Sequence, residues 1–286
     1  HWTGVTEDNQ FLMLYASTGT DGFELYYKDL EKKNGFKPLF TGFENKSSLV
    51  DHADGKFLIL TDIDAPKYRL VAIDPNNLDP TNWEELVPES DDLLQSVGTG
   101  GGKLFLNYLA KASSRIEVMD YDGSNRKIVE LPDNTGSVDG FYGRKEDEKL
   151  FYSFTSFTYP TSIYSYDIDT EESVLYYAPK LDFNPSEYES NQVMYKSKDG
   201  TEVSMFLVHK KGLELDGERP TMLYGYGGFN VSLTPSFSTT NIILLEQGGI
   251  YAMANLRGGG EYGEEWHQDG MLFNKQNVFD DFIAAA

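Results

Sequence analysis

Three glycines and two tyrosines alternate in the segment Tyr224-Gly-Tyr-Gly-Gly-Phe-Asn230, which directly follows an apolar run. Because glycine has no side chain, a substrate can approach the backbone of such a segment closely. The hydroxyl of Tyr226 can donate a hydrogen bond to the oxygen that becomes negative when an ester or amide is attacked. These residue types therefore allow oxyanion stabilisation in acyl transfer, although a segment rich in Gly and Tyr is also a common plain turn.

The position of this segment after an apolar strand matches a feature of α/β-hydrolases. In that class, the glycine-rich loop after the third strand supplies oxyanion donors, and the nucleophile is the serine of a Gly-x-Ser-x-Gly motif, followed by an acid and a histidine. Tyr226 stands where the class often has histidine, and no Gly-x-Ser-x-Gly occurs in the 286 residues. We therefore expect the nucleophile, the acid and the base to be absent from this chain.

Two further glycine-rich segments resemble nucleotide-binding motifs only superficially. Gly258, Gly260 and Gly263 form a G-x-G-x-x-G, but two strands and another glycine-rich loop come before it instead of the first turn of a βαβ unit. The run Gly98–Lys103 is one residue short of a P-loop, and Leu104 follows the lysine. The sequence therefore does not favour a nucleotide cofactor.

Residues that usually bind metals are few. The chain has no cysteine, which excludes a thiol nucleophile, disulfides and Cys-type zinc sites. The four histidines show no metal-ligand spacing, so we expect neither a metal ion nor any other cofactor; they are His1, His52, His209 and His267. We expect His209 to end a strand, and His267 to pack with Trp266 rather than act as a base.

The charge balance limits the possible partners. There are 24 Lys and Arg residues against 46 Asp and Glu residues, so the formal net charge is −22. This acidity disfavours binding to nucleic acid or to an anionic membrane surface, since both need clustered Lys and Arg. No apolar run has the length of a membrane span, and residues 1–10 do not resemble a signal peptide. A cysteine-free chain is compatible with either redox environment, so the compartment stays open between cytoplasm and periplasm.

The first 180 residues contain a repeated pair of strand-like segments. The first member of the pair begins at Phe11, Phe57, Leu104 and Leu150, in steps of 46, 47 and 46 residues. The second member ends each time in an aspartate, namely Asp29, Asp74, Asp120 and Asp167. A repeat of this length made only of strands is typical of β-propeller blades, although evenly spaced turns in a β-sandwich would give a similar pattern. We predict about four blades of a propeller.

The pattern changes after Leu181. Segments 188–196, 204–209, 221–224 and 249–255 are expected to be strands, and the last two end in glycine-rich loops, as the buried strands of α/β sheets do. We therefore predict propeller blades over residues 1–182 and the beginning of an α/β-hydrolase domain over residues 183–286.

The last ten residues are predicted to begin a helix. Asn277 can act as the N-cap, and Val278 and Phe282 form an apolar pair one turn apart. No stop signal follows them, so we expect the chain to be a fragment that ends inside a helix.

Several long motifs resemble the prolyl oligopeptidase family of serine peptidases. They comprise Tyr224–Asn230, Ala254–Gly263 with Trp266-His267, Asn274–Asn277 with Phe279–Phe282, and the shorter matches Ser197–Gly200, Val208–Gly212 and Leu215–Gly217. The resemblance implies a seven-bladed propeller above an α/β-hydrolase domain, and cleavage of short peptides on the carboxyl side of proline. It further implies that Tyr226 helps form the oxyanion hole and that Phe229 forms a wall of the proline pocket.

The sequence departs from this family in two ways. The segment Leu60–Asp64, where the family has a substrate-contacting arginine on its propeller, contains none. The Ser, Asp and His catalytic set is also missing, so we expect this chain alone to have no peptidase activity. The alternative hypothesis from another class is a non-enzymatic propeller that binds a protein or a glycan.

Overall fold

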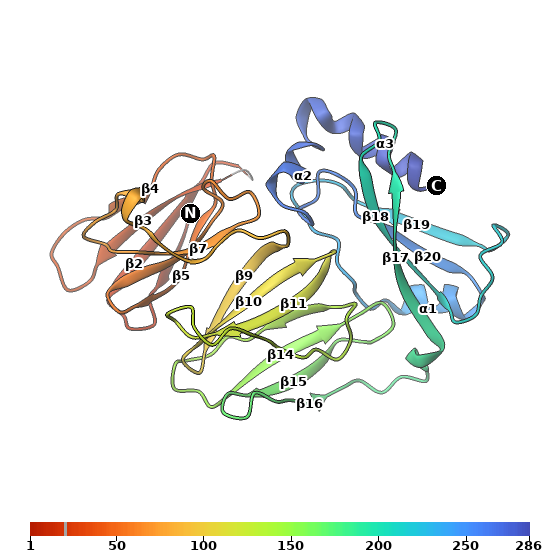
Figure 1. Ribbon diagram of the computed structural model, residues 1–286, viewed down its shortest axis with the longest axis horizontal. Coiled ribbons are helices and arrows are strands. Elements are labelled where there is room, and N and C mark those ends of the chain that lie inside the picture. The colour runs from red at the N-terminus through yellow and green to blue at the C-terminus, as the bar shows by residue number, and fades with distance from the viewer. Residues whose placement is uncertain (20–21) are drawn as a thin grey trace. The chain divides into compact units, whose positions relative to one another are not determined.

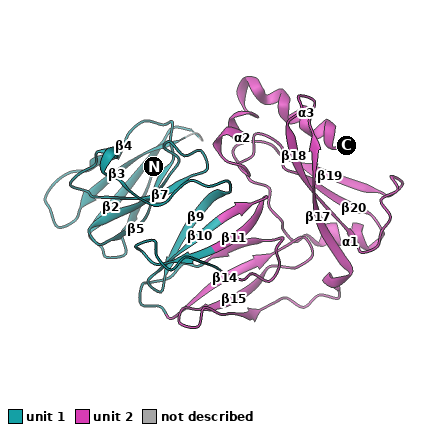
Figure 2. Cartoon of the chain, viewed as in Figure 1, with its two compact units in different colours: residues 1–107, 117–128, 141–147 teal, residues 108–116, 129–140, 148–286 magenta. Residues whose placement is uncertain are grey.

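The structure is a computed structural model that describes residues 1–19 and 22–286 (Figure 1). The chain divides into two compact units, shown in different colours in Figure 2. Unit 1 comprises residues 1–107, 117–128 and 141–147, and unit 2 comprises residues 108–116, 129–140 and 148–286. The predicted domain boundary near residue 183 stays a prediction.

The first part of the chain forms four antiparallel sheets of four strands, and within each sheet every strand pairs with its neighbour in sequence. The first two sheets contain β1 (Trp2–Val5), β2 (Phe11–Ser17), β3 (Phe23–Asp29), β4 (Lys37–Phe40), β5 (Ser47–Ala53), β6 (Lys56–Thr61), β7 (Arg69–Ile73) and β8 (Glu84–Val87). The other two contain β9 (Leu93–Gly100), β10 (Lys103–Ala110), β11 (Ser113–Met119), β12 (Lys127–Ile128), β13 (Ser137–Gly140), β14 (Lys149–Thr155), β15 (Ser162–Asp167) and β16 (Ser173–Tyr177). The predicted repeat corresponds to the second and third strands of each sheet.

Side-chain alternation and turn chemistry explain these sheets. In β2, the buried residues Phe11, Met13 and Tyr15 alternate with less buried ones, which is the period of a strand that packs on one face. The hairpin between β5 and β6 turns at Asp54 and Gly55, whose φ angles of 50° and 75° both lie in the left-handed region. Asp-Gly is the sequence that a two-residue hairpin of this kind favours.

The remainder of the chain forms a mixed sheet in the order β17-β18-β20-β19. Its elements are β17 (Tyr188–Lys196), β18 (Glu202–Lys210), β19 (Thr221–Gly225), α1 (Thr239–Glu246), β20 (Ile250–Ala254), α2 (Glu264–Gln268) and α3 (Lys275–Ala285). The short 3₁₀ turns are Pro80–Asn82, Pro185–Glu187 and Leu272–Asn274. β19 and β20 are parallel, and α1 connects them, as a βαβ crossover requires.

Helices cover both faces of this sheet (Figure 1). Ile242 and Leu245 of α1 belong to a core cluster that contains Phe206 of β18 and Tyr251 and Met253 of β20. The alternate residues of the same two strands face the other way, and Val278 of α3 packs in a cluster with Met205, Ala252 and Ala254. The last strands therefore belong to a layered α/β arrangement, as predicted.

Sequence reasoning missed two helices, α1 and the five-residue α2, and misplaced the start of a third. It did not predict α1, which has eight residues, only two of them buried, and no hydrogen bond from a capping side chain. Such a helix lacks the capping residue and the periodic apolar residues from which a helix is predicted. α3 begins at Lys275 with Asn274 as its N-cap, and the predicted cap Asn277 instead donates its side-chain N–H to the carbonyl of Asp269 at 2.9 Å.

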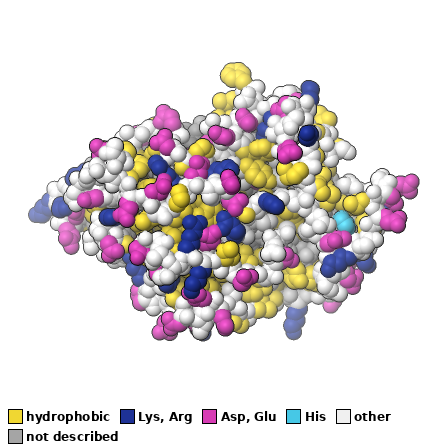
Figure 3. All heavy atoms as spheres, in the orientation of Figure 1, with side chains coloured by type: hydrophobic (Ala, Val, Ile, Leu, Met, Phe, Trp, Pro, Cys, Tyr) yellow, Lys and Arg dark blue, Asp and Glu magenta, His cyan; other side chains and the backbone are white. Residues whose placement is uncertain are grey.

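Figure 3 shows Asp and Glu side chains scattered across the visible face, with Lys and Arg among them. Over residues 1–19 and 22–286, no helix is both long and apolar enough to cross a membrane.

Candidate functional site

The glycine–tyrosine segment leaves the sheet where β19 ends. β19 and β20 run in parallel, and their last residues, Gly225 and Ala254, are register partners. The loops that follow, 226–230 and 255–260, therefore start side by side at the carboxyl edge of the sheet. This is the edge at which α/β proteins bind their ligands.

The backbone of the first loop requires its glycine. Gly227 has φ of 60°, and a Cβ atom there would lie 2.4 Å from Cγ1 of Val278 and 2.8 Å from the carbonyl oxygen of Arg257. Phe229 and Asn230 also lie in the left-handed region, with φ of 54° and 57°. This conformation is uncommon for residues with side chains, so neighbouring groups must hold it in place.

Hydrogen bonds to the second loop hold this conformation. The backbone N–H of Asn230 donates to the carbonyl of Gly258 at 3.2 Å. Nδ1 of the buried His267 lies 2.8 Å from the same carbonyl oxygen and 3.2 Å from the backbone nitrogen of Asn230. Among the described residues no ring contact joins His267 to Trp266, and the Trp266 ring packs edge-on against Tyr262 with 5.1 Å between the ring centroids. His267 thus fixes the loop backbone.

Tyr226 and Phe229 are the exposed side chains of this loop, at 47% and 71% relative accessibility. Within the described part of the chain, the Tyr226 hydroxyl has no hydrogen-bond partner. The phenol is therefore not committed to the interior, and its O–H is available to an external acceptor. An exposed aromatic ring at Phe229 offers apolar surface three residues away.

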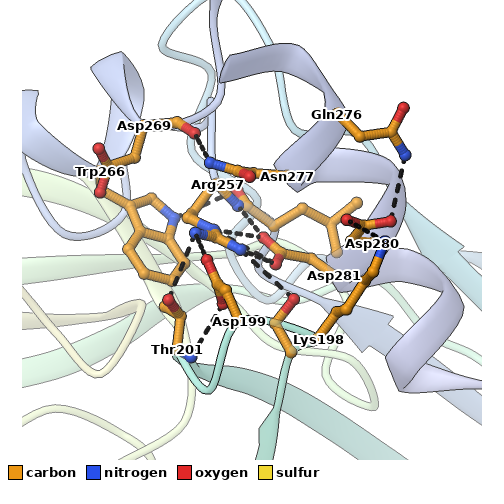
Figure 4. A network of polar contacts seen from close by, with 12 residues as sticks. Lys198, Asp199, Thr201, Arg257, Trp266, Asp269, Gln276, Asn277, Asp280 and Asp281 are labelled. Atoms are coloured by element: carbon orange, nitrogen blue, oxygen red, sulfur yellow. Dashed lines mark hydrogen bonds and ion pairs between the residues drawn. The ribbon is translucent and has the colours of Figure 1, made fainter.

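A buried ionic network is centred on Arg257 of the second loop (Figure 4). The guanidinium of Arg257, 3% exposed, donates to the fully buried carboxylate of Asp281 in α3 at 2.6 Å. It also donates to Asp199 at 2.6 Å and to Thr201 at 3.3 Å, both in the turn between β17 and β18. The hydrogen bond from Arg257 is the main cause that lowers the pKa of Asp199 below its usual value, while the bond to Asp281 raises the pKa of Arg257.

The network joins the turn, the second loop and α3 at one residue. The sequence showed Arg257 only as part of a glycine-rich motif. The only sign in the sequence that Arg257 is important was its place between an apolar strand and three glycines. That sign could not identify its partners Asp199 and Asp281, which are distant in the sequence.

Glu261 is another buried ionisable residue close to the two loops. Its side chain is 1% exposed, and burial raises its pKa to about 7. One carboxyl oxygen accepts hydrogen bonds from the backbone N–H of Leu233 at 2.8 Å and from the side-chain amide of Asn255 at 3.3 Å. The other carboxyl oxygen has no partner among the described residues.

The other residues discussed in the sequence analysis make contacts within the fold. His209 lies at the end of β18, as predicted, and Nδ1 of His52 lies 2.6 Å from the carboxylate of Asp8. In the segment Leu60–Asp64, Asp62 is buried and accepts the backbone N–H of Lys46 at 2.8 Å. A search of residues 1–19 and 22–286 finds no group of three or more His, Cys, Asp or Glu side chains that could hold a metal ion.

Comparisons with protein families cover both parts of the chain. The family described as "Prolyl oligopeptidase, N-terminal beta-propeller domain" matches residues 1–179. The family described as "Prolyl oligopeptidase family" matches residues 235–286. The predicted fold class, propeller blades followed by the first part of an α/β-hydrolase domain, is confirmed.

Similar proteins agree with these matches. A prolyl endopeptidase of Elizabethkingia miricola is 46% identical over 98% of this chain and 40% of its own length. A prolyl endopeptidase of Dictyostelium discoideum is 38% identical over 81% of this chain and 32% of its own length. The chain thus spans at most about 40% of the length of these two relatives.

Solved structures extend the agreement to three dimensions. One from a structural and mechanistic study of two prolyl endopeptidases superposes with a TM-score of 0.92, at 41% identity, over 99% of this chain and 42% of its own. Prolyl oligopeptidase B of Galerina marginata, bound to a 35mer hydrolysis and macrocyclization substrate, superposes with a TM-score of 0.90 at 29% identity. The superposition covers 99% of this chain and 41% of the Galerina chain. With a propeller-family match over more than half of its residues, this chain belongs to the prolyl oligopeptidase family.

Proposed function

We propose that this chain is part of a serine endopeptidase that cleaves short peptides on the carboxyl side of proline. The observation that carries the proposal is the Tyr226 hydroxyl, which is exposed and unbonded within the described residues on a firmly held loop at the carboxyl edge of the sheet. The proposal is supported by the relatives, whose names are those of prolyl endopeptidases and prolyl oligopeptidases. Propeller blades over 1–182 and peptidase-domain elements over 183–286 are part of the proposal.

Tyr226 would stabilise the oxyanion. When a serine attacks the carbonyl of the scissile bond, the carbonyl oxygen acquires negative charge, and a fixed O–H donor lowers the energy of that state more than that of the substrate. A donor on a preformed loop needs no reorganisation at the moment of reaction, which is the source of its effect.

Phe229 would contact the proline ring of the substrate. A pyrrolidine ring offers a compact apolar surface whose φ angle is already fixed, so little conformational freedom is lost on binding. The exposed aromatic ring of Phe229 provides a complementary apolar face. Short peptides that contain proline are therefore the proposed substrates.

Substitution of Tyr226 by Phe in the whole protein tests the oxyanion role. Tyr226→Phe removes only the hydroxyl, and we expect kcat to fall by roughly 10- to 1,000-fold, the range around that for losing one oxyanion donor. Because the ring remains, KM for a proline-containing reporter peptide should change little.

Tyr224→Phe is the matched control. Tyr224 lies in the same segment and is exposed to a similar degree, so the same chemical change two residues away should leave kcat unchanged. An unaltered kcat in Tyr226→Phe would contradict the assigned role. A whole-protein sequence without a Gly-x-Ser-x-Gly motif would instead favour the binding-module alternative.

A further inference from the structure

Lys275 occupies a position that helix electrostatics disfavour. It is the first residue of α3, where the helix dipole presents its positive end, and the first turn of α3 contains no acidic residue. Its half-buried side chain does not turn away to solvent. Instead, Nζ donates to the carbonyl oxygen of Gly227 at 2.5 Å. The contact thus joins α3 to the loop that carries Tyr226.

The ammonium group and the tyrosine ring both lie beside Gly228. A Cβ atom built on Gly228 would lie 3.5 Å from Nζ of Lys275 and 3.8 Å from Cε1 of Tyr226. The lysine and the tyrosine therefore flank the same glycine. A charged donor forms a stronger hydrogen bond than a neutral one, so this single contact can restrain a peptide unit that has no side chain of its own.

We propose that Lys275 is a positioning residue for Tyr226, an inference that rests on the proposed function. By binding the Gly227 carbonyl, the ammonium fixes the left-handed turn that follows the tyrosine and so fixes the place of the hydroxyl. The hydrogen bond to Gly227 thereby compensates for the unfavourable interaction of a cation with this end of α3.

The kinetic test compares Lys275→Met with Lys275→Arg in the whole protein. Methionine keeps much of the length and apolar stem but loses the charge and the donors, and we expect kcat to fall by about 10- to 100-fold while KM stays within about twofold. Arginine can still donate to a carbonyl oxygen and should restore most of the rate.

Lys198→Met is the matched control for the kinetic test. The exposed Nζ of Lys198 lies 3.5 Å from Asp280 of the same helix, and no contact joins it to Gly227 in the described residues. We therefore expect its kcat to be unchanged.

A double-mutant cycle separates this inference from the function on which it rests. If Lys275 acts through Tyr226, adding Lys275→Met to Tyr226→Phe should lower kcat by no more than about threefold beyond the single change. Fully multiplicative losses would overturn the inference, as would an unaffected Lys275→Met beside an impaired Tyr226→Phe. An unaffected Tyr226→Phe would refute the proposed oxyanion role itself.

Amide hydrogen exchange in the whole protein gives a readout that does not need activity. Lys275→Met should accelerate exchange at Asn230, whose N–H closes the loop onto Gly258, by about tenfold or more, and leave Val208 in β18 unchanged. Unchanged exchange at Asn230, or equal acceleration at Val208, would overturn the positioning role.

Discussion

Glu261 makes the stability of the loop region sensitive to protons. Its carboxyl group is buried, and one of its oxygens has no partner among the described residues. Burial therefore destabilises the charged carboxylate relative to the neutral, protonated form. Nothing in the sequence distinguished this glutamate from Glu264 and Glu265 nearby, because burial depends on which loops fold over it. The roles of Tyr226 and Phe229, in contrast, were predicted from their motif and stay predictions.

Stability should fall with rising pH because of Glu261. Its pKa of about 7 in the fold exceeds the ordinary 4.5, so the folded state binds the proton more tightly than the unfolded chain does. The stabilisation is complete below about pH 4.5 and is lost as pH rises through about 7. Between pH 5 and pH 8, the natural chain should lose roughly 2 to 3 kcal/mol more of its unfolding free energy than Glu261→Gln does.

Urea unfolding at the two pH values measures this difference. Glu265→Gln, at an exposed neighbouring position, is the control and should behave like the natural chain. Parallel pH profiles for Glu261→Gln and the natural chain would show that Glu261 titrates normally.

At the scale of elements, Arg257 joins three segments that are separate in the sequence. Its partners come from the turn between β17 and β18 and from α3, so no local pattern could indicate them. The second and third strands of the first four sheets were predictable because each is a short run of apolar and aromatic residues bounded by turn residues. The helix α1 was not, since tertiary packing of two residues stabilises it in place of a cap.

Arg257→Met should destabilise the fold by about 3 to 5 kcal/mol, because the buried carboxylate of Asp281 loses its cation. Lys198→Met, which removes an exposed ion pair to the neighbouring Asp280, should cost less than about 1 kcal/mol. Removing both buried charges in Arg257→Met with Asp281→Leu should recover much of the loss. Chemical denaturation checks all three variants, and a loss below about 1 kcal/mol in Arg257→Met would contradict the importance of the network.

At the scale of the whole molecule, the purified 286-residue chain should not hydrolyse a proline-containing reporter peptide. It contains the proposed oxyanion donor Tyr226 but no Gly-x-Ser-x-Gly serine to attack the carbonyl. A fluorogenic assay at high protein concentration, with the whole protein as the positive control, measures this. Turnover that copurifies with the chain and is lost in Tyr226→Phe would contradict the prediction.

The two kinds of sheet in this chain also differ in how early they can form. In the first four sheets each strand pairs with its sequence neighbour, so only short loops must close. In the last sheet, β18 pairs with β20, although β19 and α1 lie between these two strands in the sequence. β19 forms its backbone hydrogen bonds only with β20. Such long-range pairing is slow. During synthesis on the ribosome, the meandering sheets can therefore be complete while β19 still awaits its partner, and the loop 226–230 becomes ordered only after β20 has been synthesised.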